Sequence, residues 1–423
     1  MALKRGWMRL LTAMVAGGFL GCATTSARLD SVEVRYQFEP EPRAVLEPLG
    51  VERARYPKLA TSSTRGASGS VQMLAVVDEG DQSHLRLFVS DDSGDTFEFD
   101  GDVSPAEADV KASTESSPTY VVGHGAAAVW EQAGALVFAR AVGWDSPRHF
   151  FEPLKLPVKE RPSMNSFATL ARAPDGALYV VWLDGREGPV GVYLRKSVDG
   201  GETFGPNVQV EPSVCPCCRP TVAFGANGAV HVAWRHVFEG NIRDIVVATS
   251  LDGGQVFEDP VRVAEDGWMI EGCPDVGPAM AQQGDRLYIA WYTKDRGDML
   301  RVRLSWSDDS GASFAPAVDA SGDVADPTRP HLSASPDGHT ALVFQGREPA
   351  TDGGAWNPVV PFLVDISESG KVSPPTLVPG TVGNVSGVVV EAGQGGRAFL
   401  AWTERRDGRD QAMFTRARRF ETR

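Results

Sequence analysis

Residues 197–204 read SVDGGETF, and this stretch carries the strongest indication of the fold. Serine, aspartate, glycine and a closing phenylalanine return with the same spacing in three other places. Short polar side chains that bond to nearby backbone, followed by glycine at positive φ, favour a β-turn. The pattern predicts four copies of one turn, whose residues have a structural role. They are Ser90, Asp92 and Gly94; Ser197, Asp199 and Gly201; Ser250, Asp252 and Gly254; and Ser307, Asp309 and Gly311.

A second repeat sets the number of structural units. Short runs of apolar and β-branched residues end in tryptophan or an equivalent apolar residue, at intervals of 52 to 58 residues. Each run follows a turn sequence and lies between two other strand-like segments, so one unit is a meander of about four strands. Such a unit is typical of one blade of a β-propeller. The seven markers are Val77, Trp130, Trp182, Trp234, Trp291, Phe344 and Trp402.

Seven markers predict an all-β chain with seven four-stranded blades. The last unit supplies only three strand-like segments, at 386–392, 398–404 and 411–418. We expect residues 31–39 to add the fourth strand and close the ring, because closure hides sheet edges that promote association. Six blades with an additional hairpin or small subdomain are the alternative.

The four turns resemble the Asp-box (BNR) repeat of the sialidase superfamily, S-x-D-x-G-x-T-W/F. The resemblance implies a sialidase-like propeller in which the boxes lie on the rim, away from the central pocket. It also implies three arginines around a carboxylate, an aspartate acid/base, and a tyrosine nucleophile beside a glutamate. Arginine suits the first role because its guanidinium pairs with a carboxylate through two parallel hydrogen bonds.

Two arginines match this implied site. Arg219 and Arg329 precede a proline at equivalent places in units four and six. Arg55, in the segment Arg55-Tyr56-Pro57, resembles the family's first arginine but comes too early in the alignment of the units. The alternative for each is an arginine that bonds loop carbonyls or a carboxylate of a neighbouring blade.

No sequence motif supports the candidates for the other catalytic roles. Asp78 is the candidate acid/base, Glu131 a channel carboxylate and Tyr292 a candidate nucleophile. The family's tyrosine normally follows the third arginine late in the chain, whereas Tyr292 is the last tyrosine of this sequence. The sequence therefore favours a binding propeller over an exo-sialidase.

Four cysteines occur in equivalent loops of units four and five. Cys215, Cys217 and Cys218 belong to SVCPCCRP, and Cys273 belongs to EGCPD. We expect the four sulfurs to lie together at one end of the channel. They fit either the disulfides of an exported protein or a thiolate site for Cu(I) or tetrahedral Zn, with His236 as a further candidate ligand.

The N-terminus has the features of an export signal. Basic residues precede the uncharged segment 10–20, which is too short to span a bilayer as a helix. Gly21-Cys22 resembles the end of a bacterial lipobox, and a plain secretory signal is the alternative. We expect residues 1–21 to be a signal peptide, residues 22–30 a lipidated N-terminus and tether, and residues 31–423 one propeller.

The formal net charge of -14 argues against a nucleic-acid or anionic-membrane surface. The lipid anchor is the one membrane contact that we expect. The leading hypothesis is an exported lipoprotein of the cell envelope, facing the periplasm or the surface, that binds a glycan or another envelope ligand. The alternatives are an exo-sialidase-like glycoside hydrolase and an envelope metal or redox protein.

Overall fold

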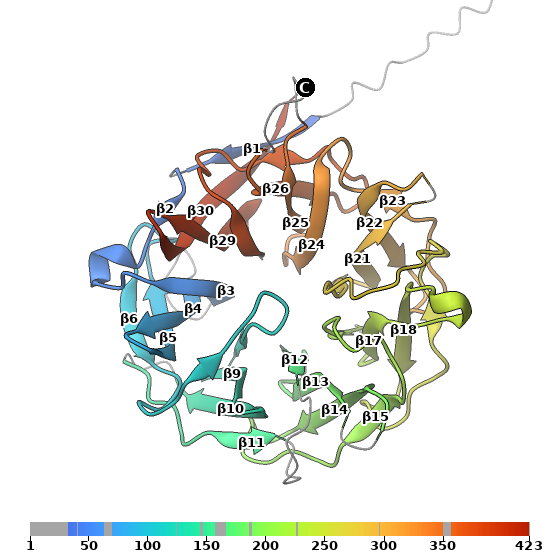
Figure 1. The fold of residues 1–423 in the computed structure, drawn as a ribbon, viewed down its shortest axis with the longest axis horizontal. Coiled ribbons are helices and arrows are strands. Elements are labelled where there is room, and N and C mark those ends of the chain that lie inside the picture. The colour runs from blue at the N-terminus through green and yellow to red at the C-terminus, as the bar shows by residue number, and fades with distance from the viewer. Residues whose placement is uncertain are drawn as a thin grey trace, which may run out of the picture.

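The computed structural model shows a seven-bladed β-propeller (Figure 1). It describes residues 33–422 except 40, 63–69, 124, 144–146, 157–165, 186–187, 226, 296 and 350–356. The described strands form seven antiparallel sheets around a common centre, which confirms the prediction of seven blades rather than six. The expected signal segment and Cys22 lie outside the described residues.

The first four blades follow one another along the chain, each with its strands in sequence order from the centre outward. Blade 1 contains β3 (Ala54–Ser62), β4 (Ser70–Glu79), β5 (Gln82–Ser90) and β6 (Glu98–Asp102); blade 2 contains β8 (Thr119–Val122), β9 (Gly125–Gln132), β10 (Ala135–Val142) and β11 (Leu154–Leu156), with β7 (Val110–Lys111) also paired to β9; blade 3 contains β12 (Ser166–Arg172), β13 (Leu178–Asp184), β14 (Gly191–Ser197) and β15 (Val208–Glu211); blade 4 contains β16 (Thr221–Phe224), β17 (Val230–Arg235), β18 (Ile245–Ser250) and β19 (Val261–Arg262).

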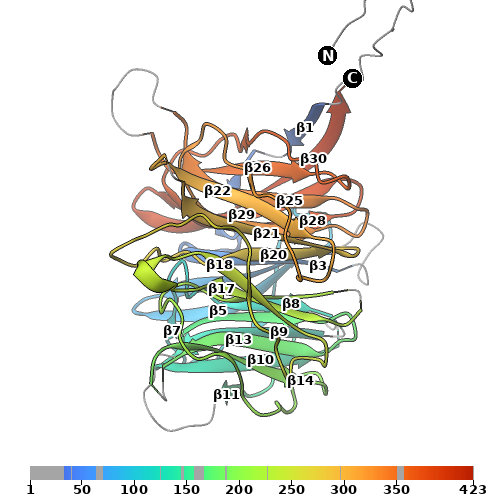
Figure 2. The same ribbon diagram turned by 90° about the vertical axis from the view of Figure 1, so that its right-hand side faces the viewer.

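The last three blades complete the ring. Blade 5 contains β20 (Ala279–Gln283), β21 (Arg286–Lys294), β22 (Leu300–Ser307) and β23 (Val318–Asp319); blade 6 contains β24 (Ala325–Ala334), β25 (Thr340–Arg347), β26 (Val360–Ile366) and β27 (Thr376–Leu377); blade 7 contains β28 (Val385–Gly393), β29 (Arg397–Arg406), β30 (Arg409–Thr422), β1 (Glu33–Phe38) and the short β2 (Arg43–Ala44). β1 pairs antiparallel with β30, so an N-terminal strand closes the ring as expected. The two strands extend together beyond the ring (Figure 2).

The core of the molecule lies between neighbouring blades. All seven markers lie on the second strand of their blade and are buried. Trp234 of blade 4, for example, belongs to one cluster with Tyr179 and Val181 of blade 3. Adjacent blades therefore share their apolar surfaces around the ring.

The four turn segments connect the third and fourth strands of blades 1, 3, 4 and 5. In each, the serine Oγ accepts a hydrogen bond from the N–H of the glycine and donates one to the aspartate. In the blade 4 turn, the Ser250 Oγ lies 2.9 Å from the Gly254 nitrogen and 2.7 Å from the Asp252 Oδ1. The same contacts occur in the other three turns.

These turns also pack against the preceding blade. A Cβ on Gly94 would lie 2.2 Å from the Phe414 ring of blade 7, and a Cβ on Gly201 would lie 2.4 Å from the Phe138 ring of blade 2. The turn phenylalanine lies in the same interface, as Phe204 against Phe138 shows. The turn therefore contributes an aromatic contact between neighbouring blades.

Helical structure is limited to two 3-10 turns within the described residues, η1 (Glu47–Leu49) and η2 (Glu239–Asn241). Within this part of the chain no helix has the length and apolar character needed to cross a bilayer.

Candidate functional site

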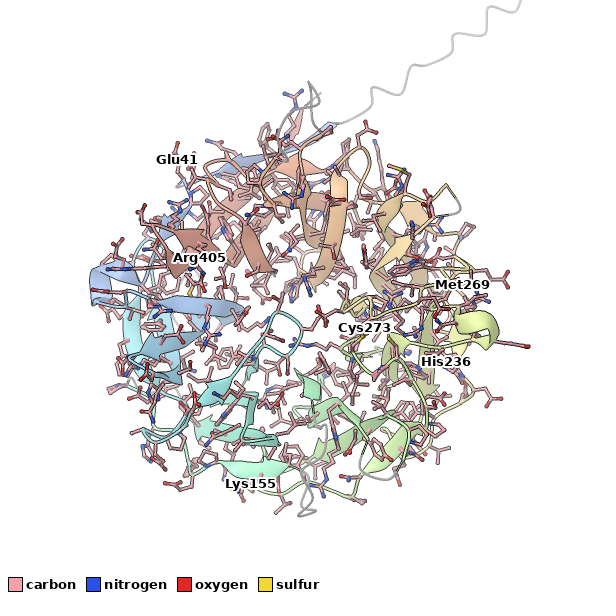
Figure 3. All side chains as sticks on the ribbon, viewed as in Figure 1. Glu41, Lys155, His236, Met269, Cys273 and Arg405 are labelled. Carbon is pink, nitrogen blue, oxygen red and sulfur yellow. A yellow bond between two sulfur atoms is a disulfide. The ribbon has the colours of Figure 1, made fainter. Side chains whose placement is uncertain are left out.

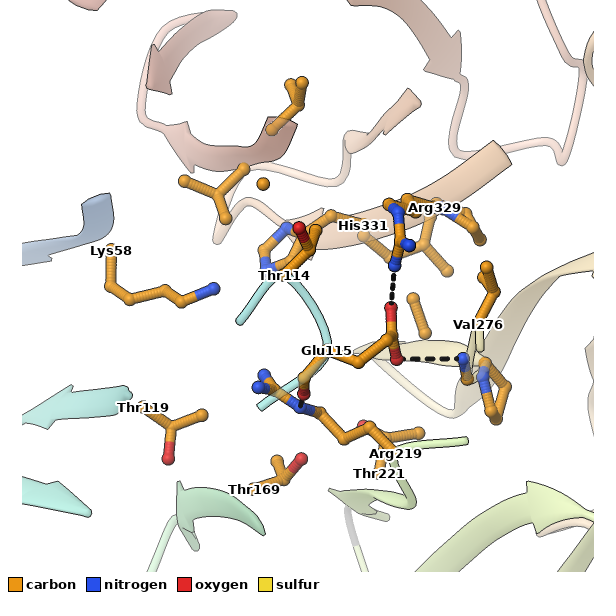
Figure 4. Close-up of a pocket in the computed structure, with 18 of the residues that line it drawn as sticks. Lys58, Thr114, Glu115, Thr119, Thr169, Arg219, Thr221, Val276, Arg329 and His331 are labelled. Atoms are coloured by element: carbon orange, nitrogen blue, oxygen red, sulfur yellow. Dashed lines mark hydrogen bonds and ion pairs between the residues drawn. The ribbon is translucent and has the colours of Figure 1, made fainter. Parts of the chain in front are cut away.

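The innermost strands of all seven blades line one cavity of about 230 Å³. Six of its lining residues have equivalent places, because each pairs with the residue just before the marker of its blade. Lys58 of β3 supplies the side chain from blade 1, where it pairs with Leu74 (Figure 4). The six residues with equivalent places come from blades 2 to 7 in order: Thr119, Thr169, Thr221, Ala279, His331 and Val389.

β-Bulges interrupt the pairing of two inner strands that line this cavity. The pairing of β24 with β25 shifts around Arg329, whose φ is 57°. The pairing of β3 with β4 shifts between Arg55 and Lys58, with Tyr56 at a φ of 51°. A residue other than glycine in this left-handed conformation costs about 1–3 kcal/mol, and such residues concentrate at functional sites.

Glu115 is the carboxylate at the centre of the cavity. It lies between β7 and β8, on a segment that enters the centre of the ring (Figures 1 and 4). Arg329 donates from Nη1 to Oε1 at 2.6 Å, and the backbone N–H of Gly277 donates to Oε2 at 3.2 Å. Burial raises the pKa of Glu115, while Arg329 and Arg219 oppose this rise.

Arg219 lies on the other side of Glu115 (Figure 4) and binds the backbone of the same segment. Its Nε donates to the Glu115 carbonyl at 2.7 Å, and its Nη2 donates to the Ser117 carbonyl at 2.7 Å. A Cβ on Gly277 would lie 2.1 Å from the Arg219 carbonyl oxygen, so glycine is required where the two loops meet. The two arginines singled out from the sequence are thus brought together, and each also makes the loop or carboxylate contacts considered as the alternative.

Lys58 adds a third basic side chain to the cavity. Burial and the neighbouring Arg219 lower its pKa to about 7, against the opposing effect of Glu115. Within the described part of the chain, no ion pair of at most 4.0 Å forms at Lys58. Its amino group points into the cavity (Figure 4).

Arg55 has a different place from the one its motif suggested. It forms a two-pronged ion pair with Asp78 at 2.9–3.2 Å, and its Nη2 also donates to Ser83. These residues line a separate rim pocket of about 350 Å³ in blade 1. The hydrogen bonds from Arg55 and Ser83 lower the pKa of Asp78 against the effect of burial. Asp78 is thus an ion-pair partner on the rim and is not among the lining residues of the central cavity.

His331 and Glu391 are buried titratable groups of the inner strands. Burial, together with Lys58 and Arg219, lowers the pKa of His331 to about 3, so this imidazole is neutral at neutral pH. Burial raises the pKa of Glu391 to about 7 despite hydrogen bonds from Thr61 and Ser333. Glu391 thereby connects the inner strands of blades 1, 6 and 7.

The cysteines of the two equivalent loops meet, as expected. Cys217 and Cys273 form a disulfide that links the loop before β16 to the loop before β20. Cys215 and Cys218 remain buried thiols, and the Cys215 Sγ lies 3.6 Å from both the Cys217 and the Cys218 Sγ. A hydrogen bond with Cys218 lowers the pKa of Cys215, and the backbone of Cys217 and Arg243 act in the same direction.

His236 does not belong to the sulfur cluster found among the described residues. Its ring packs on Phe238 with 4.6 Å between centroids, and it lies farther from the ring centre than Cys273 (Figure 3). Arg235, the preceding residue, is buried and donates to the carbonyls of Arg243, Val276 and Tyr292. Arg235 therefore holds the loops of blades 4 and 5 together behind the cysteines.

No family model and no curated protein match this chain. Among solved structures, a polysaccharide lyase described as an ulvan lyase aligns with a TM-score of 0.54 and 10% identity, over 86% of this chain and 94% of that chain. A protein of unknown function from Dyadobacter fermentans aligns with a TM-score of 0.50 and 13% identity, over 91% and 99%. A Trypanosoma rangeli sialidase aligns at 0.45 and 14% identity, over 86% of this chain and 55% of the sialidase. The first two likenesses show the fold alone.

Tyr292 and Glu131, the tyrosine and glutamate singled out from the sequence, do not line the cavity. Tyr292 packs against Trp268 and is not among the lining residues. Glu131 accepts a hydrogen bond from Ser116, also away from the lining. Tyr120 is the one tyrosine among the described lining residues, but its hydroxyl is bonded to the Gln72 side chain. Glu115 also lines the cavity, but its carboxylate is bonded to Arg329 and Gly277, and within the described residues no hydrogen bond joins it to Tyr120.

Several cavity residues were not identified from the sequence. Lys58 escaped notice because Val77 lies two residues beyond the place equivalent to Trp234. Ser90 pairs with Val71 as Ser250 pairs with Val230, so Ala75 holds that place, and Leu74 before it pairs with Lys58. Glu115 lies on a connection outside every repeat, so no spacing indicated it. His331 could have been found two residues after Arg329, since that strand was already aligned by its proline.

Proposed function

We propose that this protein is an exported, lipid-anchored binding propeller of the bacterial cell envelope whose central cavity receives an acidic sugar. The observation that carries the proposal is the excess of positive charge in the cavity. Lys58, Arg219 and Arg329 face one carboxylate, Glu115, although the whole chain is strongly acidic. A local basic cavity in an acidic protein favours selective entry of an anionic group.

The two arginines are already oriented, whereas Lys58 is free to respond to a ligand. Arg219 and Arg329 are held by the Glu115 segment, so little conformational entropy is lost when they meet an anion. Threonine hydroxyls at Thr119, Thr169 and Thr221 line the same space and suit the hydroxyl groups of a sugar. Charge and hydroxyl complementarity together favour a carboxylated or sulfated saccharide.

The size of the cavity limits the ligand to one sugar residue or a chain end. Its volume of about 230 Å³ is smaller than that of typical sites for drug-sized ligands, roughly 300–1,000 Å³. The ulvan lyase propeller is described in complex with -[GlcA(1-4)Rha3S]-, which carries both a uronate and a sulfate. That ligand supports an acidic saccharide as the class to test first.

Calorimetric titration with acidic oligosaccharides and their neutral counterparts tests the binding proposal. We expect binding of uronate-, sialate- or sulfate-bearing sugars, and no measurable binding of the neutral forms. Lys58→Gln should weaken binding about tenfold or more, because a hydrogen bond to a charged group contributes about 1.5–3 kcal/mol. Lys155→Gln, at an exposed lysine of β11, is the matched control and should bind like the wild type. Equal affinity for acidic and neutral sugars would contradict the proposal.

Lipid anchoring rests on Cys22 and is tested separately. Cys22→Ser removes the expected acylation site, so the protein should leave the membrane fraction and appear in the soluble envelope fraction. Metabolic labelling with a fatty-acid analogue should mark the wild type and not the variant. Membrane retention of Cys22→Ser would show that another feature anchors the chain.

A further inference from the structure

We propose that Cys215, Cys217, Cys218 and Cys273 form a thiolate site for a soft metal ion, Zn(II) or Cu(I), when the bridge between Cys217 and Cys273 is reduced. This site is separate from the acidic-sugar cavity. Either proposal can therefore fail without the other.

The sulfur atoms of the blade 4 loop already have the spacing of metal ligands. The Cys215 Sγ lies 3.6 Å from the Cys217 Sγ and 3.6 Å from the Cys218 Sγ, and the last two are 4.0 Å apart. Thiolates about 2.3 Å from a tetrahedral zinc ion lie about 3.8 Å from one another. The three sulfurs thus occupy three corners of a tetrahedron, and they form a three-ligand group with all ligand atoms within 4.8 Å.

Cys273 supplies the fourth corner. Its Sγ is bonded to that of Cys217, so after reduction it needs only to withdraw to non-bonded distance to complete the set. One link between the two loops requires only two cysteines. The bridge leaves Cys215 and Cys218 beside it as buried thiols, and a four-thiolate site accounts for all four residues.

The surroundings suit a site with net negative charge. Arg243 donates from Nη1 to the Cys215 Sγ at 3.0 Å, which orients the sulfur and offsets the charge of the thiolates. Asn241 in turn binds the Arg243 guanidinium at 2.8–3.0 Å. Cys215 also donates its backbone N–H to the Arg235 carbonyl at 3.2 Å, which fixes the start of the loop. The ligands are therefore held by contacts outside the sulfur cluster.

The chemistry balances with a thiol reductant as the co-reactant. Two reductant thiols are oxidised to their disulfide, and the Cys217–Cys273 bond accepts two electrons and two protons to become two thiols. Metal binding then displaces the thiol protons, so affinity should rise with pH. Both Zn(II) and Cu(I) accept four or three thiolates, and separate titrations distinguish them.

The test uses full-length protein carrying Cys22→Ser, which leaves only the four clustered cysteines of the five in the chain. The protein is reduced without oxygen, freed of reductant, and titrated with Co(II) as a visible substitute for Zn(II), and separately with Cu(I) against a chromogenic chelator. We expect one equivalent of metal, thiolate-to-cobalt charge-transfer absorption, and protection of the cysteines from alkylation by mass spectrometry. The oxidised protein should bind no stoichiometric metal and show no charge-transfer band, and metal should not change the alkylation of its two free thiols, Cys215 and Cys218.

Two variants separate this site from adventitious binding. Cys215→Ser combined with Cys218→Ser should abolish stoichiometric binding, and Arg243→Gln should weaken it about tenfold by removing the hydrogen bond to sulfur. The alkylation experiment needs no variant and remains decisive if the double variant fails to fold. Full alkylation of the reduced protein in the presence of Zn(II) and of Cu(I), or equal affinity in the double variant, would overturn the proposal.

Discussion

Single side chains determine the charge of the central cavity. Lys58, Arg219 and Arg329 come from blade 1, the start of blade 4 and blade 6, and Glu115 comes from the connection into blade 2. All four are partly or wholly withdrawn from water, and the neighbouring charges act on the pKa of Lys58 and of Glu115. Changes at these residues are therefore expected to act on ligand binding and pH dependence more than on the fold.

Binding of an acidic sugar should weaken as pH rises through about 7. Burial and Arg219 lower the pKa of Lys58 to about 7, so the ammonium is present below that pH and is lost above it. A bound anion favours the ammonium and moves the midpoint of the complex to higher pH. Calorimetry from pH 5.5 to about 8.5 should show a loss of affinity that is absent in Lys58→Gln. The same steep loss in the variant would assign the titration to another group.

Glu115→Gln should have opposite effects on stability and on binding. The substitution removes the negative charge between Arg219 and Arg329, so we expect unfolding in urea to show a loss of about 2 kcal/mol. The same change leaves the cavity more positive, so affinity for an acidic sugar should increase. Glu152→Gln, on the exposed outer edge, should change neither quantity. A loss of both stability and affinity would mean that Glu115 mainly positions the arginines.

At the scale of elements, the four turns and the inner strands have separate roles. The turns connect the third and fourth strands and pack on the preceding blade, whereas the first strands line the cavity. The bulges in β3 and β24 lie in the inner strands that line the cavity. Damage to a turn should therefore loosen blade packing without a selective effect on the cavity.

Ser250→Ala tests this separation. Ser250 is buried, accepts from the Gly254 N–H and donates to Asp252, so its loss leaves a buried donor unsatisfied at a cost of about 1–3 kcal/mol. We expect a lower melting temperature and unchanged affinity for an acidic sugar. Leu251→Ala, at the exposed neighbouring position, should leave the melting temperature unchanged. Loss of binding at an unchanged melting temperature would place the turn near the ligand.

At the scale of the whole molecule, ring closure protects the last blade. β1 pairs with β30 along six residue pairs, and the Tyr36 hydroxyl donates to Asp365 of blade 6 at 3.0 Å. Without β1, β30 would present a long unpaired edge. The closing strand is therefore expected to keep the propeller monomeric as well as folded.

Deletion of residues 33–38 should lower the melting temperature and promote association, because unpaired backbone groups of β30 recruit other strands. Light scattering on heating measures both effects. Deletion of residues 24–29, within the expected tether, is the control and should leave stability unchanged. A deletion variant of 33–38 that remains monomeric with an unchanged melting temperature would show that closure depends on blade packing alone.

The sequence alone determined the fold class, the number of blades and the closing strand. These features depend on local patterns: turn residues at fixed spacing, short apolar strands, and one buried marker in each unit. Each pattern recurs along the chain, so a wrong assignment in one unit is revealed by comparison with the other units. The proximity of the four cysteines followed from the same repeat, because equivalent loops of adjacent blades must be neighbours.

The composition of the cavity was decided only by the tertiary structure. Arg219 and Arg329 were identified through their shared alignment, but Glu115 meets Arg329 across 214 residues of sequence and follows no repeat. Lys58 rather than Arg55 lines the cavity, and the register of β24 shifts beside Arg329. Such shifts depend on contacts between distant segments that hold a strained backbone in place. Local spacing thus determined where the blades lie, and long-range contacts determined which charges face the centre.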